Sequence, residues 1–174
     1  TKHSTRRCCM ADHEALNTLA TAVVSELSAS GKAVATAESC TGGWVAKAIT
    51  DVPGSSACFG YGVVSYSNGA KESILGVGNP TLEENGSVSE PVVREMAEGA
   101  LNLSGADISV AVSGIAGPDG GSKEKPVGTV WFAWSVREGA KHRIETDCKH
   151  FDGDREAIRE LTVAYALQGI LERI

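Results

Sequence analysis

The sequence lacks any apolar run close to the roughly 20 residues that a membrane-spanning helix needs. Residues 1–10 are basic in character, but no apolar segment follows them, so we do not expect them to be a secretory signal. Positive charge is not in excess either: the formal net charge is -6 and the pI is about 5.2. An acidic chain of this kind argues against a general nucleic-acid binder. We therefore expect no membrane and no nucleic acid among its partners.

Cysteines are few and irregularly placed: there are five, and no pair has CxxC spacing. An odd count in a chain large enough to build a core indicates a reducing compartment, so we expect a cytoplasmic protein. His142, Cys148 and His150 lie close together in the sequence but lack a fourth partner at zinc-site spacing. We expect an ordinary strand there and no metal.

What the sequence does contain is the composition of a single globular domain. Its 174 residues suit one core, with 42% hydrophobic and 22% charged residues. We expect one domain over residues 12–174 and an N-terminal extension over residues 1–11, with Met10 as a candidate natural start.

Helical periodicity alternates with short apolar runs along the chain, which predicts an α/β fold with a mixed sheet and helices on its faces. Asp12 is a candidate cap for the first helix, and the last helix should carry Ile158, Leu161, Tyr165 and Ile170 inward. The expected helices are 12–30, 44 onward, a short one through Lys71, 89–105 and one after Asp152; the expected strands are 33–37, 59–66, 108–112, 129–136 and 141–150.

Ser39 follows a buried strand, at the point where the chain turns into a helix. The free N–H groups and the positive dipole end of a helix favour the negative charge that develops on an attacking hydroxyl and on an oxyanion. Gly42 and Gly43 allow a ligand close to the backbone. On spacing alone, capping of the helix by Ser39 or Thr41 is the more frequent role for such residues. Cys40 is a rival nucleophile, because a thiol near a helix N-terminus can have a low pKa.

Two further segments carry candidate site residues. Lys71 can take a proton from a serine hydroxyl when burial lowers the pKa of its amine, and Tyr66 can relay or donate a proton in the same cluster. The glycine-rich loop from Ser113 to Gly121 follows a strand, as loops that present N–H groups to phosphate do. Arg155 can add a bidentate contact to such a phosphate, unless its guanidinium already pairs with the carboxylate of its neighbour Asp154.

Five segments together resemble the C-terminal domain of the competence/damage-inducible protein CinA, and the similarity covers roughly residues 12–172. They are residues 36–43 (TAESCTGG), 66–71 (YSNGAK), 88–92 (VSEPV), 113–121 (SGIAGPDGG) and 125–130 (KPVGTV). Stand-alone members of that family are nicotinamide-nucleotide amidases, which act in pyridine nucleotide salvage and NAD metabolism.

The resemblance implies a three-layer α/β/α hydrolase without a cofactor, and a chain that self-associates as a homo-oligomer. It also implies a Ser-Lys-Tyr amidase with Ser39 as nucleophile, Lys71 as general base and Tyr66 as its partner. The expected substrate contacts are Cys40, Thr41, Gly42, Ser113, Gly114, Gly117 and Arg155.

Two alternatives stay open at this point. One is a catalytically weak nucleotide-binding paralogue linked to competence or the DNA-damage response. The other is an amidase or esterase that uses the same three residues on a different substrate.

Overall fold

The computed structural model describes the backbone of residues 4–174 and the side chains of residues 13–174. At its centre lies a five-stranded sheet in the order β2-β1-β3-β4-β5. Strand β1 pairs in parallel with both β2 and β3, whereas β4 is antiparallel to β3 and to β5, which confirms the mixed sheet. The strands are β1 (Val34–Glu38), β2 (Phe59–Val64), β3 (Ile108–Gly114), β4 (Thr129–Glu138) and β5 (Lys141–His150).

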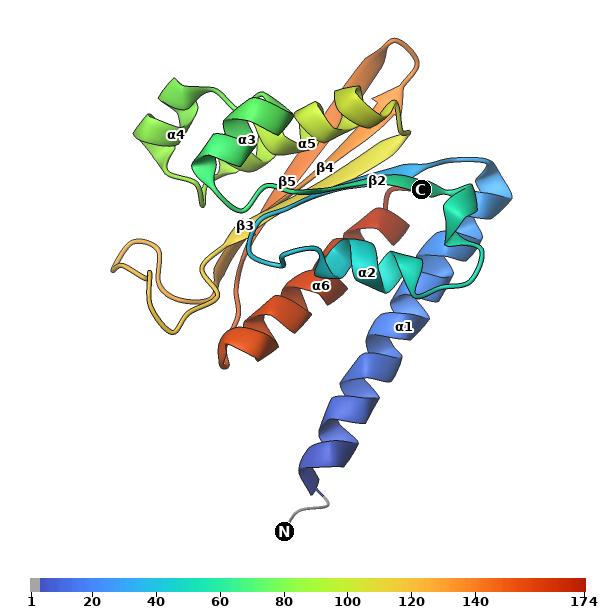
Figure 1. Cartoon of the computed structure of the whole chain (residues 1–174), viewed down its shortest axis with the longest axis horizontal. Coiled ribbons are helices and arrows are strands. Elements are labelled where there is room, and N and C mark those ends of the chain that lie inside the picture. Colours follow the sequence, from blue (N-terminus) through green and yellow to red (C-terminus); the bar gives the residue numbers. More distant parts are fainter. Residues whose placement is uncertain (1–3) are drawn as a thin grey trace.

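Helices cover both faces of this sheet, so the expected α/β/α layering is confirmed (Figure 1). One face carries α3 (Asn68–Leu75), α4 (Asn79–Asn85) and α5 (Glu90–Ser104). The other carries α1 (Ser4–Ser30), α2 (Trp44–Thr50) and α6 (Arg155–Leu171), and a short 3-10 turn, η1 (Ser55–Ala57), follows α2. In the part of the chain that the structure describes, no helix is both long and apolar enough to cross a membrane.

The two faces of the sheet bury two separate apolar clusters. On the side of α1 and α6, Leu27, Trp134 and Leu167 are among the fully buried side chains. On the side of α5, Met96 packs against the small residues of the central strands. Strand β1 is buried at every position, as a central parallel strand between two helix layers must be. The carboxyl end of β1 is therefore fixed between the two helix layers.

Three expectations about the elements were wrong. Asp12 cannot cap the first helix, because α1 begins at Ser4 and runs through it. Helix α4 was not expected, since its sequence NPTLEEN is polar and buries only Leu82, which leaves no apolar periodicity to detect. On α6, Ile158 and Ile170 are buried but Leu161 is 43% exposed, because it lies in an open groove between α6 and α1.

Candidate active site

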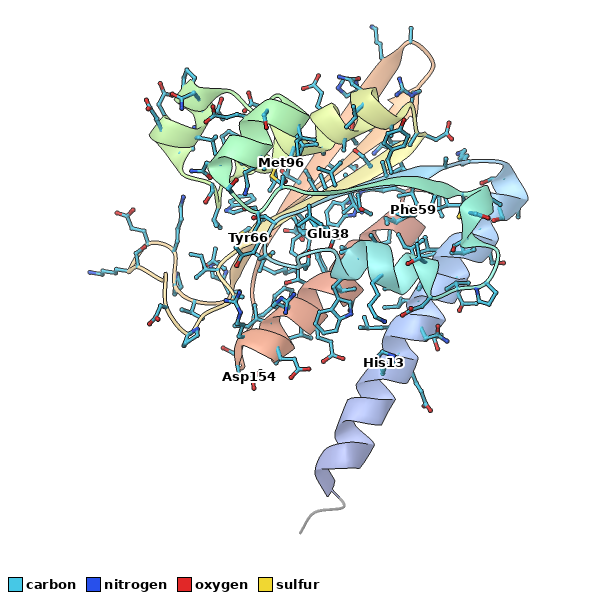
Figure 2. All side chains as sticks on the ribbon, in the orientation of Figure 1. His13, Glu38, Phe59, Tyr66, Met96 and Asp154 are labelled. Carbon is cyan, nitrogen blue, oxygen red and sulfur yellow. The ribbon has the colours of Figure 1, made fainter. Side chains whose placement is uncertain are left out.

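Three loops meet at one edge of the sheet, where the parallel strands β1, β2 and β3 end. The loop after β1 begins with Ser39, and the loop after β2 begins with Ser65, whose N–H donates to the Glu38 carbonyl at 2.8 Å. Figure 2 shows Glu38 and Tyr66 at this edge of the sheet. A pocket of about 280 Å³ opens there, lined by Ser39, Cys40, Tyr66, Ser87, Val88, Ser113, Gly114, Ile115, Ala116, Gly117, Asp119, Gly120 and Arg155.

Lys71 reaches this edge from α3 and meets Ser39, which lies 32 positions earlier in the chain. The Ser67 hydroxyl caps α3 by accepting the Ala70 N–H, so the helix begins only a few residues after β2 ends. Lys71 therefore lies in the first turn of α3, close to the ends of the parallel strands. Lys71 Nζ lies 2.9 Å from Ser39 Oγ, 2.8 Å from the Ser65 carbonyl oxygen and 3.3 Å from the Tyr66 carbonyl oxygen. Its side chain is only 1% exposed.

Burial lowers the pKa of the Lys71 amine below its ordinary value, since the charged form loses its hydration. A neutral amine has two N–H donors and one lone pair. The carbonyls of Ser65 and Tyr66 can accept both donors, which leaves the lone pair for the hydroxyl of Ser39. This geometry allows Lys71 to remove the Ser39 proton directly.

Ser39 was expected at the first turn of α2. It lies instead in the turn of residues 39–43, which precedes that helix. The N-terminal end of α2 is bound by the buried Glu38, whose carboxylate accepts the N–H groups of Val45 at 2.7 Å and Ala46 at 3.1 Å. Thr41 donates its hydroxyl to the same carboxylate at 2.6 Å. Neither Ser39 nor Thr41 therefore caps the helix.

Glu38 was not expected as a site residue, although a carboxylate at the end of an otherwise uncharged strand is an unusual feature. Burial raises the pKa of its carboxyl group, and the donors from Thr41, Val45 and Ala46 oppose that shift. Because every one of these partners donates, the side chain ties the start of α2 to the turn that carries Ser39.

Replacing Glu38 with glutamine is expected to lower the free energy of unfolding by about 1–3 kcal/mol, since the amide turns a donor toward the helix N–H groups. Urea denaturation of the variant and the wild type measures this difference. Glu83→Gln, at an exposed position of α4, is the matched control. Equal denaturation midpoints for Glu38→Gln and Glu83→Gln would show that the carboxylate does not hold this turn.

Cys40 lines the pocket but is poorly suited to act as the nucleophile. Its side chain is buried, and the loss of hydration raises the pKa of the thiol to about 12. The reactive form of a cysteine is the thiolate, which is scarce at such a pKa. The geometry thus favours Ser39 over its neighbour.

Tyr66 and Arg155 meet at the mouth of the pocket. The Tyr66 ring is 60% exposed, and its hydroxyl oxygen accepts a hydrogen bond from Arg155 Nη2 at 3.1 Å. Arg155 Nη1 donates to the Gly117 carbonyl at 2.7 Å. Tyr66 was expected to bring its phenol to Lys71, but it contacts the amine only through its backbone carbonyl. Asp154 does not pair with Arg155, because its carboxylate caps α6 by accepting the Ala157 N–H at 2.9 Å.

The structure gathers most of the other expected contact residues around the same pocket. Ser113, Gly114 and Gly117 line it, and the Ser113 hydroxyl donates to the Ser87 carbonyl at 2.7 Å. Thr41 and Gly42 do not line the pocket, since Thr41 is fully buried and Gly42 is exposed outside it. Ser87 and Val88 were missed because they follow α4, the helix that the periodicity did not predict. Among the residues whose side chains are described, no three His, Cys, Asp or Glu side chains gather as metal ligands do.

Comparison with known proteins agrees with this arrangement. The model of the CinA C-terminal domain family matches residues 16–174. The nicotinamide-nucleotide amidohydrolase PncC of Escherichia coli K12 is 54% identical over 164 residues, which cover 94% of this chain and 97% of that protein. The protein of the same name from Pseudomonas putida is 52% identical over 157 residues, covering 90% of this chain and 96% of its own.

A solved structure has the same fold. The competence damage-inducible protein A (ComA) from Klebsiella pneumoniae superposes with a TM-score of 0.86 at 43% identity, covering 91% of this chain and 96% of that one. On these grounds the chain belongs to the CinA C-terminal domain family.

Proposed function

We propose that the protein hydrolyses the carboxamide of nicotinamide mononucleotide, releasing nicotinate mononucleotide and ammonia. The observation that carries this proposal is the buried Lys71 amine, 2.9 Å from Ser39 Oγ and flanked by two carbonyls that leave its lone pair free. The substrate class is supported by the relatives named nicotinamide-nucleotide amidohydrolase, which match this chain over nearly their whole length.

The reaction begins when the neutral amine of Lys71 takes the Ser39 proton as Ser39 Oγ attacks the carboxamide carbon. The quaternary nitrogen of the pyridinium ring withdraws electrons from that carbon and makes it more electrophilic. A tetrahedral intermediate forms, with a negative charge on the former carbonyl oxygen. Lys71 now carries the proton as an ammonium group.

The N–H of Cys40, a residue that lines the pocket directly after the nucleophile, is the candidate donor to this oxyanion. The N–H of Gly42 already donates to the Ser39 carbonyl at 3.1 Å. Among the described residues no backbone carbonyl accepts the N–H of Cys40. A single donor of this kind contributes about 10²–10³ in rate in other hydrolases.

The Lys71 ammonium gives its proton to the amide nitrogen as the intermediate collapses and the C–N bond breaks, so that the nitrogen leaves as ammonia. The nicotinate group is then an ester of Ser39. Water attacks this ester, with Lys71 again as the base, and Ser39 leaves with the returned proton. The products are the free carboxylate and the original enzyme.

Arg155 is suited to bind the phosphate of the nucleotide. Its guanidinium contacts only the Gly117 carbonyl and the Tyr66 hydroxyl, both neutral, and no carboxylate within ion-pair distance is found among the described residues. Because its charge is not neutralised, it can bind an anion at the pocket mouth. We assign to Tyr66 the orientation of Arg155 and of the ring, in place of proton relay. The glycine-rich loop at Ser113, Gly114 and Gly117 forms the facing wall.

Replacing Arg155 with glutamine is expected to raise KM for nicotinamide mononucleotide about 10- to 100-fold, as loss of a charge-assisted contact does. KM for nicotinamide riboside, which has no phosphate, should stay nearly unchanged. Steady-state ammonia release with both substrates measures the two effects. Arg94→Gln, at an exposed ion pair on α5, is the matched control. An equal rise in KM for both substrates would exclude the phosphate contact.

Ammonia release from nicotinamide mononucleotide tests the proposed function itself. Wild-type protein should produce one equivalent of nicotinate mononucleotide per ammonia. Tight binding of the nucleotide without ammonia would instead identify a binding module, one of the alternatives that the sequence left open. Turnover of other amides or esters, but not of this nucleotide, would point to a different specificity.

Self-association and a cytoplasmic location are further parts of the proposal. The first is supported by the family resemblance, and sedimentation velocity would test it. The second is supported by the odd number of cysteines in a chain that builds a full core.

A further inference from the structure

The two edges of the sheet differ in charge. Strand β5 forms one edge, and Lys, Arg, Asp or Glu occupies five of its ten positions. Arg143 pairs with Glu138 at 2.9 Å and with Glu145 at 2.7 Å, and Lys149 Nζ lies 3.8 Å from the Asp147 carboxylate. Charged side chains on an edge strand are a common means by which proteins prevent pairing with another chain. The β5 edge is therefore protected.

Strand β2 forms the other edge and has no such charges. In the described part of the chain it pairs only with β1, and Figure 1 shows it at the margin of the sheet between α2 and α3. Residues 52–70 contain no charged residue, whereas every other uncharged run in the chain is at most 11 residues long. The one irregularity lies at Gly60, at the start of the strand, and pairing with β1 is regular from Tyr61 to Val64. This half of β2 thus lacks the charges, prolines and bulges that keep an edge from pairing.

Apolar side chains are exposed on both faces of the β2 edge. Tyr61 and Val64 are each 48% exposed. Val64 lies on the face of α2, since a Cβ at Gly43 would contact its side chain at 3.5 Å. Val63 packs against the cluster on the side of α5, so Tyr61, two positions earlier, lies on that face as well. Exposed apolar side chains along an unprotected edge strand are typical of a surface that another chain covers.

The backbone of β2 also presents hydrogen-bonding groups along this edge. The Ser65 N–H donates to the Glu38 carbonyl on β1 at 2.8 Å. In a parallel ladder alternate residues bond to a given neighbour, so Val63 and Ser65 bond to β1, whereas Gly62 and Val64 direct their N–H and C=O groups away from the sheet. Gly62 is exposed and has no side chain to obstruct another strand. A second strand can therefore form hydrogen bonds with these two residues.

We propose that β2 is the interface between two copies of this chain, which pair their β2 strands antiparallel about a two-fold axis into one sheet with five strands from each copy. Gly62 of each copy then lies opposite Val64 of the other, so that the outward N–H and C=O groups of both strands are paired.

A second copy is the partner that fits this edge. Two identical edges match each other, and antiparallel pairing about a two-fold axis closes at two copies. Each copy has a net charge of -6, so two copies repel least along their longest uncharged run. This inference is independent of the amidase reaction, and it assigns a surface to the proposed self-association.

Sedimentation velocity at about 1 to 100 µM protein, the range in which modest interfaces form, tests the proposal. The wild type should sediment as a dimer. Val64→Lys should raise the dissociation constant of the dimer about 100-fold or more, because it places charges of like sign in an apolar contact. Val64→Pro should also weaken the dimer, since proline removes an N–H that faces the second copy and none that bonds to β1. Leu161→Lys, at a similarly exposed apolar position of α6, is the matched control and should leave the dimer intact.

The outcomes separate the interface from the other proposals. A wild type that is monomeric over the whole range overturns both the interface and the self-association, whereas ammonia release tests the amidase reaction separately. A dimer that persists in folded Val64→Lys and Val64→Pro overturns the β2 interface alone. Dissociation by Leu161→Lys but not by Val64→Lys overturns it as well. Circular dichroism verifies folding; if Val64→Lys does not fold, Tyr61→Lys replaces it, and an intact dimer in that variant contradicts the proposal.

Discussion

Replacement of Ser39 by alanine is expected to reduce kcat for ammonia release by about 10⁴- to 10⁶-fold, as removal of the nucleophile does in other serine hydrolases. The physical reason is that Lys71 has no other hydroxyl at hydrogen-bond distance among the described residues, so no acyl-enzyme can form. A coupled assay for ammonia with nicotinamide mononucleotide measures the loss.

The same variant should keep its fold and its affinity for the nucleotide. Ser39 is 8% exposed, and the substitution removes one hydroxyl without creating a large cavity. Thermal unfolding and the dissociation constant of nicotinate mononucleotide should therefore match those of the wild type. Ser25→Ala, at an exposed position of α1, provides the control for serine removal as such. Turnover by Ser39→Ala within tenfold of Ser25→Ala would exclude Ser39 as the nucleophile.

Replacement of Lys71 by methionine is expected to lower kcat about 10²- to 10⁴-fold, the range that a general base contributes. Methionine has a similar length and suits a buried site, so loss of the base should dominate over loss of packing. The carbonyls of Ser65 and Tyr66 lose a donor, which adds some cost in stability. Steady-state kinetics over a range of pH give both kcat and its pH dependence.

The pH dependence distinguishes a base from a structural lysine. Burial lowers the pKa of Lys71, and the neutral amine is the active form. The activity of the wild type should therefore rise with pH through that lowered pKa, below the ordinary value of 10.5 for a lysine. In Lys71→Met this rise should disappear, whereas the exposed control Lys47→Met should keep it. An identical pH profile in Lys71→Met and the wild type would contradict the assignment.

How much of this site could be predicted from sequence depends on how local each feature is. The turn at Ser39 follows from a short apolar run that ends in a glycine-rich segment, and the structure places it directly after β1. Lys71 is different, because nothing in its local pattern says that it is buried. Its pairing with Ser39 depends on the parallel neighbours β1 and β2, and the family resemblance suggested it where periodicity did not.

The remaining features depend on tertiary contacts that no local pattern encodes. Tyr66 follows β2 as expected, yet the direction of its ring is set by Arg155 from the distant helix α6. Arg159 on α6 donates to the Cys40 carbonyl across 119 positions, so spacing gives no sign of this contact. Helix α4 is too short and too polar to show an apolar face, and the loop after it supplies one wall of the pocket.

Direct detection of a covalent ester on Ser39 tests the central claim, that a neutral lysine makes this serine a nucleophile. Wild-type protein is mixed with nicotinamide mononucleotide, quenched in acid within milliseconds and digested, and the peptide that contains Ser39 is examined by mass spectrometry. We predict a mass increase equal to the nicotinoyl-nucleotide group on Ser39 and, when hydroxylamine is present during turnover, the corresponding hydroxamate. Full turnover with an unmodified Ser39 peptide and no hydroxamate would contradict the account.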